Sequence, residues 1–163
     1  RQLDHAATRV RAEDRDPAIL EFMALTNYTF SFAIHVPKLN SITNVARLPN
    51  ATFAMVFTSG EHPYIGDDES GPTERFVHYY GPRVHHLAFH TEQIEETFAG
   101  LKRDGMDFLV DLVGSPQEGL RQTFSQMSPT TLLVNEYIHR YGDFDGFFTQ
   151  DNVAALTEAT GRQ

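Results

Sequence analysis

Among the histidines and carboxylates of this 163-residue chain, three are candidates to bind one divalent metal ion together: His5, His86 and Glu136. Each lies in a run of apolar and β-branched residues that is typical of a strand. His5 and His86 occupy the same place in two repeats of one strand-and-helix pattern. Glu136 is a carboxylate on an otherwise apolar strand face, where a charge is costly unless it is paired or metal-bound.

The chemistry of this set is that of a facial triad, in which two imidazoles and one carboxylate hold one side of a metal. Such a triad leaves three coordination positions open, and these positions suit a bidentate substrate together with O₂. The sequence contains no cysteine, so a disulfide and a thiolate metal site are both excluded. Fe(II), Mn(II), Zn(II), Ni(II) and Mg(II) remain, and Fe(II) is the metal that we expect.

Strand alternation separates the other histidines. In the predicted strand Arg83–Phe89, His86 and the following His90 share the face toward the interior, whereas His85 lies on the opposite face. His90 is therefore a candidate substrate contact, with a packed rim histidine as the alternative. His85 is expected to pack or to support the site. The remaining histidines are expected at the surface: His35, His62, His78 and His139.

The elements that position these residues follow one order twice. The first strand is predicted at Leu3–Val10, and a helix begins at Asp16-Pro17. Three strands follow, at Thr29–Val36, Ile42–Leu48 and Thr52–Thr58. The second set begins with the strand of His86 and a helix capped by Thr91. Its three later strands are predicted at Met106–Leu112, Leu120–Ser125 and Thr131–Ile138, and a last helix covers Asp151–Thr160.

This repeated β-α-β-β-β order predicts an α+β fold in which two modules form an open, cupped barrel with helices outside. We expect a single domain over residues 1–163. Its parts are module one at 1–60, a loop at 61–80, module two at 81–148 and a C-terminal helix at 149–163. Within the loop, residues 75–80 are expected to form a short helical turn. The cup is concave and suits a small-molecule ligand.

The composition limits the partners of the chain. Hydrophobic residues make up 40%, with 13 Phe and 6 Tyr, which is enough for a core. The net charge is −9 and no basic cluster is present, so nucleic acid and anionic membrane surfaces are disfavoured. No apolar run approaches the ~20 residues of a membrane span, and no signal peptide is visible. We expect a soluble, cytoplasmic protein whose partners are a small-molecule substrate and O₂.

Three motifs resemble those around the metal ligands of one enzyme family. Leu3-Asp4-His5 is similar to the strand of the first ligand, and residues 80–88 (YGPRVHHLA) resemble the Gly-Pro-x-Val-x-His-x-Ala segment around the second. Residues 135–140 (NEYIHR) resemble the Phe-Glu-Ile-Ile-x-Arg run of the ligand carboxylate. The chain thus resembles the catalytic C-terminal half of 4-hydroxyphenylpyruvate dioxygenase, in the vicinal-oxygen-chelate (glyoxalase, bleomycin-resistance and dioxygenase) superfamily. The resemblance implies that His5, His86 and Glu136 bind Fe(II).

The resemblance and the strand alternation together indicate five substrate contacts. Residues 119–125 are similar to the strand that presents a substrate-facing Gln, and residues 146–159 resemble the closing helix of the family. The expected contacts are Gln122, Phe124, His90, Phe147 and Asn152. The chain also departs from the family, which carries an additional metal-free N-terminal domain. Two phenylalanines that clamp the substrate ring in the family are replaced by Val134 and Val153.

The resemblance implies a mononuclear non-haem Fe(II) dioxygenase that acts with O₂ on a 2-oxo acid or a related small aromatic substrate. An extradiol dioxygenase uses the same triad and is an open alternative. A glyoxalase-type lyase or isomerase takes a fourth ligand from the strand at 52–58, which offers none. A small-molecule binding module without catalysis is a further alternative. Members of the family often associate through their modules, so a homodimer is also expected.

Overall fold

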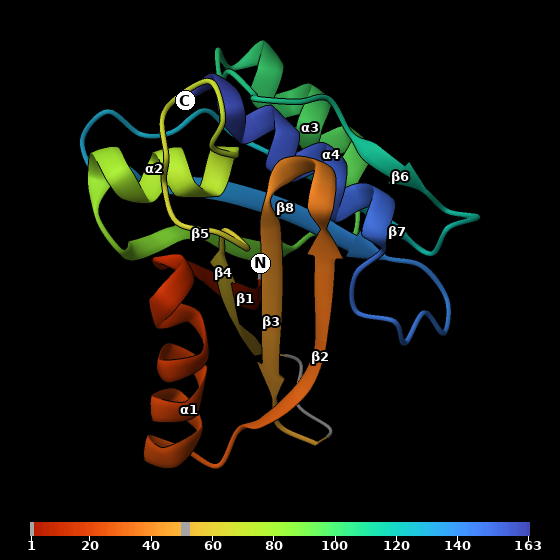
Figure 1. Ribbon diagram of the computed structural model, residues 1–163. Helices are drawn as coiled ribbons and strands as arrows, with labels where there is room; N and C mark the ends of the chain where they lie inside the picture. The colour runs from red at the N-terminus through yellow and green to blue at the C-terminus, as the bar shows by residue number, and fades with distance from the viewer. Residues whose placement is uncertain (1, 50–52) are drawn as a thin grey trace.

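The computed structural model describes residues 2–49 and 53–163. Its strands form one eight-stranded sheet in the order β2-β3-β4-β1-β5-β8-β7-β6 (Figure 1). The strands are β1 (Gln2–Arg9), β2 (Thr29–Val36), β3 (Ser41–Arg47), β4 (Ala54–Ser59), β5 (Arg83–His90), β6 (Val113–Ser115), β7 (Leu120–Phe124) and β8 (Val134–Arg140). The α-helices are α1 (Arg15–Leu25), α2 (Pro72–Tyr80), α3 (Ile94–Arg103) and α4 (Gln150–Ala159).

The sheet is built from two βαβββ modules, which confirms the predicted α+β architecture. In each module the first and last strands are parallel neighbours, β1 with β4 and β5 with β8. The modules meet where β1 pairs antiparallel with β5. Twist curls such a sheet into a half-barrel. The three strands β1, β5 and β8 are therefore adjacent, and they carry His5, His86 and Glu136.

Helix α4 closes the open side of the half-barrel. It contacts the edge strand β2 of the first module and β6 and β7 of the second, so it bridges the two edges of the sheet (Figure 1). Thr149 caps the helix, because its hydroxyl oxygen accepts a hydrogen bond from the Asn152 N–H at 3.3 Å. The predicted C-terminal helix is thereby confirmed.

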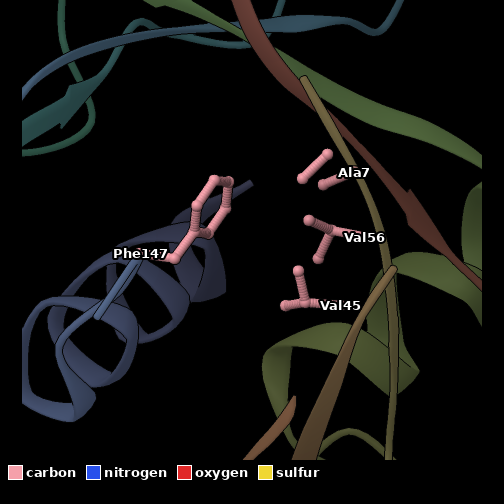
Figure 2. Close-up of a cluster of buried hydrophobic side chains, with 5 residues drawn as sticks. Ala7, Val45, Val56 and Phe147 are labelled. Atoms are coloured by element: carbon pink, nitrogen blue, oxygen red, sulfur yellow. The ribbon is translucent and has the colours of Figure 1, made fainter. Parts of the chain in front are cut away.

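Strand alternation separates an outer from an inner core. On the outer face Ala46 and Phe57 pack against Ile19 of α1. The inner face carries a cluster of five buried residues: Ala7, Val45, Ala54, Val56 and Phe147. Figure 2 shows Phe147 reaching from the segment before α4 toward the strand residues Val45 and Val56. One aromatic side chain thus connects the closing segment to the first module.

The predicted strand Met106–Leu112 is absent from the structure. Phe108 makes only an isolated bridge to Ser125, and β6 begins later, at Val113. The Thr123 hydroxyl donates to the Val110 carbonyl at 2.7 Å, which occupies a backbone acceptor that a ladder would use. This part of the second module is therefore irregular.

Other boundaries also differ from the predicted ones. Helix α1 begins before Asp16, and α3 begins at Ile94, so neither Asp16 nor Thr91 is a cap. The Thr91 hydroxyl donates instead to the Phe89 carbonyl. Helix α2 begins at Pro72 and is longer than the predicted turn. Thr52, the first residue of one predicted strand, lies outside the described residues. None of the described helices is long and apolar enough to cross a membrane.

Candidate metal centre

His5, His86 and Glu136 converge inside the half-barrel. One carboxylate oxygen of Glu136, Oε2, lies 3.1 Å from Nε2 of His5 and 3.2 Å from Nε2 of His86. One ligand atom from each residue lies within 4.8 Å of the other two. His5 and Glu136 are each only 1% exposed. Three neighbouring strands thus bring two imidazoles and one carboxylate to a single buried point.

A β-bulge in β1 lies beside His5. Between Leu3 and His5 the partner strand β5 advances by only one residue, so Asp4 is the extra residue. The Asp4 carboxylate accepts a hydrogen bond from Nδ1 of His5 at 2.7 Å, and Nη2 of Arg140 donates to it at 2.9 Å. This contact orients the ring so that Nε2 of His5 faces Glu136 at 3.1 Å and is the nitrogen that could bind a metal.

The charges around His5 favour a cation at this point. Burial by itself raises the pKa of Asp4, but His5 and Arg140 outweigh burial and lower that pKa to about 2. Burial by itself lowers the pKa of His5, but the charges of Glu136 and Asp4 outweigh it and raise that pKa to about 9. Without a metal, His5 is therefore an imidazolium between two carboxylates. The same electrostatic field would attract a metal ion.

A second β-bulge lies in β5, beside His86. While β1 advances from Ala7 to Thr8, β5 advances by two residues, from His86 to Val84, so His85 is the extra residue. The prediction that His85 lies on the opposite face was wrong, because the bulge interrupts the alternation of side chains. His85 lines the same cavity as His86. Their Nδ1 atoms lie 2.9 Å apart.

This contact selects the tautomer of His86. Burial lowers the pKa of both His85 and His86 well below the usual value, so both rings are neutral. If His86 is to bind a metal through Nε2, its Nδ1 must carry the proton and donate to Nδ1 of His85. His85 then donates from Nε2 to the Gln163 amide oxygen at 3.1 Å. His85 therefore orients His86 for metal binding.

Glu136 is held at its second oxygen. The Gln122 amide donates from Nε2 to Oε1 of Glu136 at 2.6 Å, and the Asn152 amide donates to the Gln122 oxygen at 3.0 Å. All three side chains are buried. This chain of hydrogen bonds joins β8, β7 and α4. It occupies Oε1 and leaves Oε2 facing the two imidazoles, which suits a monodentate ligand.

A small cavity lies against the three residues, and we call it the triad cavity. Its volume is about 50 Å³. Its apolar walls are Phe124 from β7, Phe148 from the closing segment, and Val153 and Leu156 from α4. A space of this size holds only a few water molecules. A substrate of aromatic size exceeds this space, so its binding would require side chains of the cavity wall to move.

No protein-family model matches the sequence, and no curated protein matches it. Solved structures do match the fold. A variant of 4-hydroxymandelate synthase from Streptomyces coelicolor has a TM-score of 0.82 and 22% identity over 99% of this chain and 54% of that chain. Methylmalonyl-CoA epimerase from Mycobacterium tuberculosis has a TM-score of 0.67 and 16% identity over 94% of this chain and 91% of its own. A hypothetical protein from Bacillus halodurans has a TM-score of 0.68 and 14% identity, covering 88% and 97%.

These superpositions agree with the paired modules and the curled sheet. The chain has the vicinal-oxygen-chelate fold. It spans about half the length of the synthase and most of the length of the epimerase. Within this vicinal-oxygen-chelate fold, the concave face of the sheet carries His5, His86 and Glu136.

The five predicted substrate contacts of this vicinal-oxygen-chelate fold do not all line the same cavity. Gln122 and Phe124 line the triad cavity. His90 and Phe147 line a separate, second cavity instead. Asn152 reaches the triad through its hydrogen bond to Gln122. The Phe147 ring also contacts His5, with the two ring centroids 5.9 Å apart, so three of the five touch the triad or its cavity directly and one, Asn152, is linked to it indirectly.

Three other contributors were not predicted, and a fourth, His85, was expected to support the site but from the opposite face of the strand. Asp4 adjoins His5 in the sequence, and that adjacency was the available signal. His85 reaches the cavity through a bulge, which depends on strand pairing and has no sequence signature here. Phe148 lines the cavity with its ring centroid 5.0 Å from that of His5, and its neighbour Phe147 was predicted instead. Arg9 is a buried cation in the cavity wall, although arginine side chains are usually exposed to solvent.

The donor set of this vicinal-oxygen-chelate fold fits a first-row divalent metal. Bonds of about 2.1 Å at right angles place neighbouring ligand atoms about 3.0 Å apart. The two observed nitrogen–oxygen distances, 3.1 and 3.2 Å, agree with this spacing. Two imidazole nitrogens and one carboxylate oxygen suit Fe(II), Mn(II) or Zn(II) better than Mg(II). Among the described residues, no further His, Asp, Glu or Cys joins the group.

Metal affinity should rise with pH. Because the pKa of His5 is raised to about 9 in the metal-free protein, a metal must displace one proton from it below that pH. We expect the apparent association constant for Zn(II), a redox-inert probe, to rise about tenfold per pH unit from about pH 6 to pH 8 and to level off above about pH 9. Competition with a chromogenic chelator measures this slope. A flat profile would contradict a ligand role for His5.

Proposed function

We propose that this chain is a mononuclear non-haem Fe(II) dioxygenase that acts with O₂ on a small 2-oxo acid or a related small aromatic compound. The observation that carries the proposal is the convergence of two imidazole nitrogens and one carboxylate oxygen from three strands at one buried point. A set of two His and one carboxylate with open positions is characteristic of Fe(II) oxygenases. The similarity to a 4-hydroxymandelate synthase variant supports it at the level of the fold.

In this proposal the metal is held by His5 and His86 through Nε2 and by Glu136 through Oε2. When bound, Fe(II) supplies open coordination positions and the electrons for reaction with O₂. The protein supplies the rest. Asp4 and His85 keep a proton on Nδ1 of each ligand imidazole, which leaves each Nε2 free.

Other residues of the cavity would exclude water and orient the substrate. Phe124, Phe148 and Leu156 form an apolar wall that keeps bulk water away from the triad. Gln122 uses one amide N–H on Glu136 and its oxygen on Asn152, so its second N–H is the group available to a substrate oxygen. The expected role of Gln122 as a substrate contact therefore rests on that single donor.

The alternatives differ in their ligands and in their products. A glyoxalase-type lyase or isomerase would need a fourth ligand from β4, which presents Val56 and Thr58 to the cavity. The overlap with the epimerase covers nearly its whole length and keeps that class as the second candidate. An extradiol dioxygenase would use the same three ligands. A binding module would retain metal or ligand without turnover.

The test is anaerobic loading with Fe(II), followed by air and a panel of 2-oxo acids that includes arylpyruvates. The proposal predicts coupled O₂ uptake and CO₂ release. Turnover of catechols with O₂ uptake and no CO₂ would indicate the extradiol class. Retention of one metal ion with neither reaction would overturn the oxygenase proposal and favour a lyase, an isomerase or a binding module.

A further inference from the structure

Arg9 is a buried arginine that has no counter-charge. It is 5% exposed and lines the triad cavity. Nη2 donates to the Thr160 hydroxyl at 2.8 Å, and the guanidinium lies 5.1 Å from the centroid of the Phe76 ring. Nη1 is buried and has no hydrogen-bond partner. Among the described residues, no carboxylate forms an ion pair with Arg9.

Such an arrangement costs folding energy. A buried charge without a partner loses its hydration and gains no compensating attraction. Burial lowers the pKa of Arg9 to about 9, so the side chain remains a cation near neutral pH. Groups that reduce stability in this way are commonly kept for function. The missing partner is therefore expected to be an anion that enters the cavity.

The position of Arg9 shows which part of a ligand it would meet. His5, Ala7 and Arg9 alternate along the same face of β1 and all line the triad cavity. Four residues of strand separate the Cα atoms of His5 and Arg9 by about 13 Å, and Thr160 and Phe76 hold the Arg9 guanidinium, so Arg9 approaches the cavity from the far end of β1. Beside it Thr43 and Thr58 share a hydroxyl–hydroxyl hydrogen bond of 3.1 Å.

We propose that Arg9 and the neighbouring threonine hydroxyls bind a carboxylate at the end of the substrate that is remote from the metal. The substrate class is then a 2-oxo acid with a second carboxylate, which would bind the metal at one end and Arg9 at the other. A carboxylate fits better than a phosphate because the cavity is small and Nη1 is the nitrogen of Arg9 that is both buried and without a hydrogen-bond partner. This inference rests on the proposed metal site for the position of the first end.

Calorimetry on anaerobic, Fe(II)-loaded protein tests the inference with matched pairs of ligands. The pair 2-oxoglutarate and 2-oxopentanoate differs in the remote carboxylate, and oxaloacetate and 2-oxoadipate vary the length. For the length that fits, we expect the diacid to bind at least about tenfold more tightly than its mono-acid. Arg9→Met should abolish the preference, whereas Arg9→Lys should keep part of it. Arg11→Met, which removes an exposed arginine close by, should leave it unchanged.

Stability separates a binding role from a structural one. If Arg9 serves a ligand, metal-free Arg9→Met should unfold at the same temperature as the parent protein or at a higher one. Lower stability with an intact diacid preference would overturn the inference, as would equal affinities for all pairs. If no 2-oxo acid binds in an Fe(II)-dependent manner, the proposed function fails instead. In that case glutarate binding to metal-free protein still tests Arg9: loss of binding in Arg9→Met supports the site, and unchanged binding overturns it.

Discussion

Glu136→Gln is expected to abolish stable metal binding. The substitution keeps the volume of the side chain but removes the negative charge that both imidazoles face at 3.1 and 3.2 Å. Loss of a partner that supports a ligand typically lowers metal affinity about 10–100-fold. Because Glu136 would itself be a ligand, we expect a larger loss, measured as metal content after Fe(II) loading and dialysis.

His90→Ala is the matched control for this experiment. His90 lies on β5 like His86, but it lines the second cavity rather than the triad cavity. Its removal should leave the metal content near one equivalent, with the far-ultraviolet circular dichroism of both variants unchanged. Equal metal content in Glu136→Gln and the parent protein would remove the basis of the proposed function.

Phe147→Ala should produce the largest loss of stability. Phe147 is buried against the inner cluster of the first module (Figure 2). Its ring lies 4.2 Å from the guanidinium carbon of Arg140 and 4.7 Å from that of Arg47. Truncation of a buried phenylalanine typically costs about 3–5 kcal/mol. Urea denaturation should show a fall of about 3 kcal/mol or more in the free energy of unfolding.

Phe148→Ala provides the comparison. Phe148 is only partly buried, so its truncation should cost less stability while enlarging the triad cavity. The backbone of Phe147 has a φ of +60°, which Gly tolerates better than any other residue. Alanine at position 147 keeps this backbone strain, so the stability lost in Phe147→Ala reflects the missing side chain alone. Comparison with Phe148→Ala then shows how much more the buried ring contributes than the partly buried one. A smaller loss for Phe147→Ala than for Phe148→Ala would contradict this account.

The convergence of His5, His86 and Glu136 and the fold were predictable for the same reason. His5 and His86 occupy equivalent positions in a repeated strand order, and the first strands of the two modules pair at the centre of the sheet. Parallel pairing of β5 with β8 then brings Glu136 next to Ala88 on the strand of His86. These relations depend on element order and alternation, which a sequence pattern records.

What could not be predicted depends on contacts between strands. The bulges at Asp4 and His85 arise from the register of β1 against β5, and that register is set by packing on both faces of the sheet. Burial of Arg9 likewise depends on where α2 and the C-terminal residues pack. The strand expected at 106–112 is reduced to one bridge beside the neighbouring strand, and its Val110 carbonyl accepts from the Thr123 side chain, a contact that a sequence pattern does not record.

The order of elements along the chain has a consequence for biosynthesis. Strand β1 leaves the ribosome well before β8, and α4, which bridges both edges of the sheet, emerges after both modules. A nascent chain therefore holds His5 long before its partners exist, and α4 cannot cover the site until both modules have been made. Any metal would therefore be bound by all three residues only once β8 has been made. Folded protein without a metal would carry a proton on His5 in place of the ion.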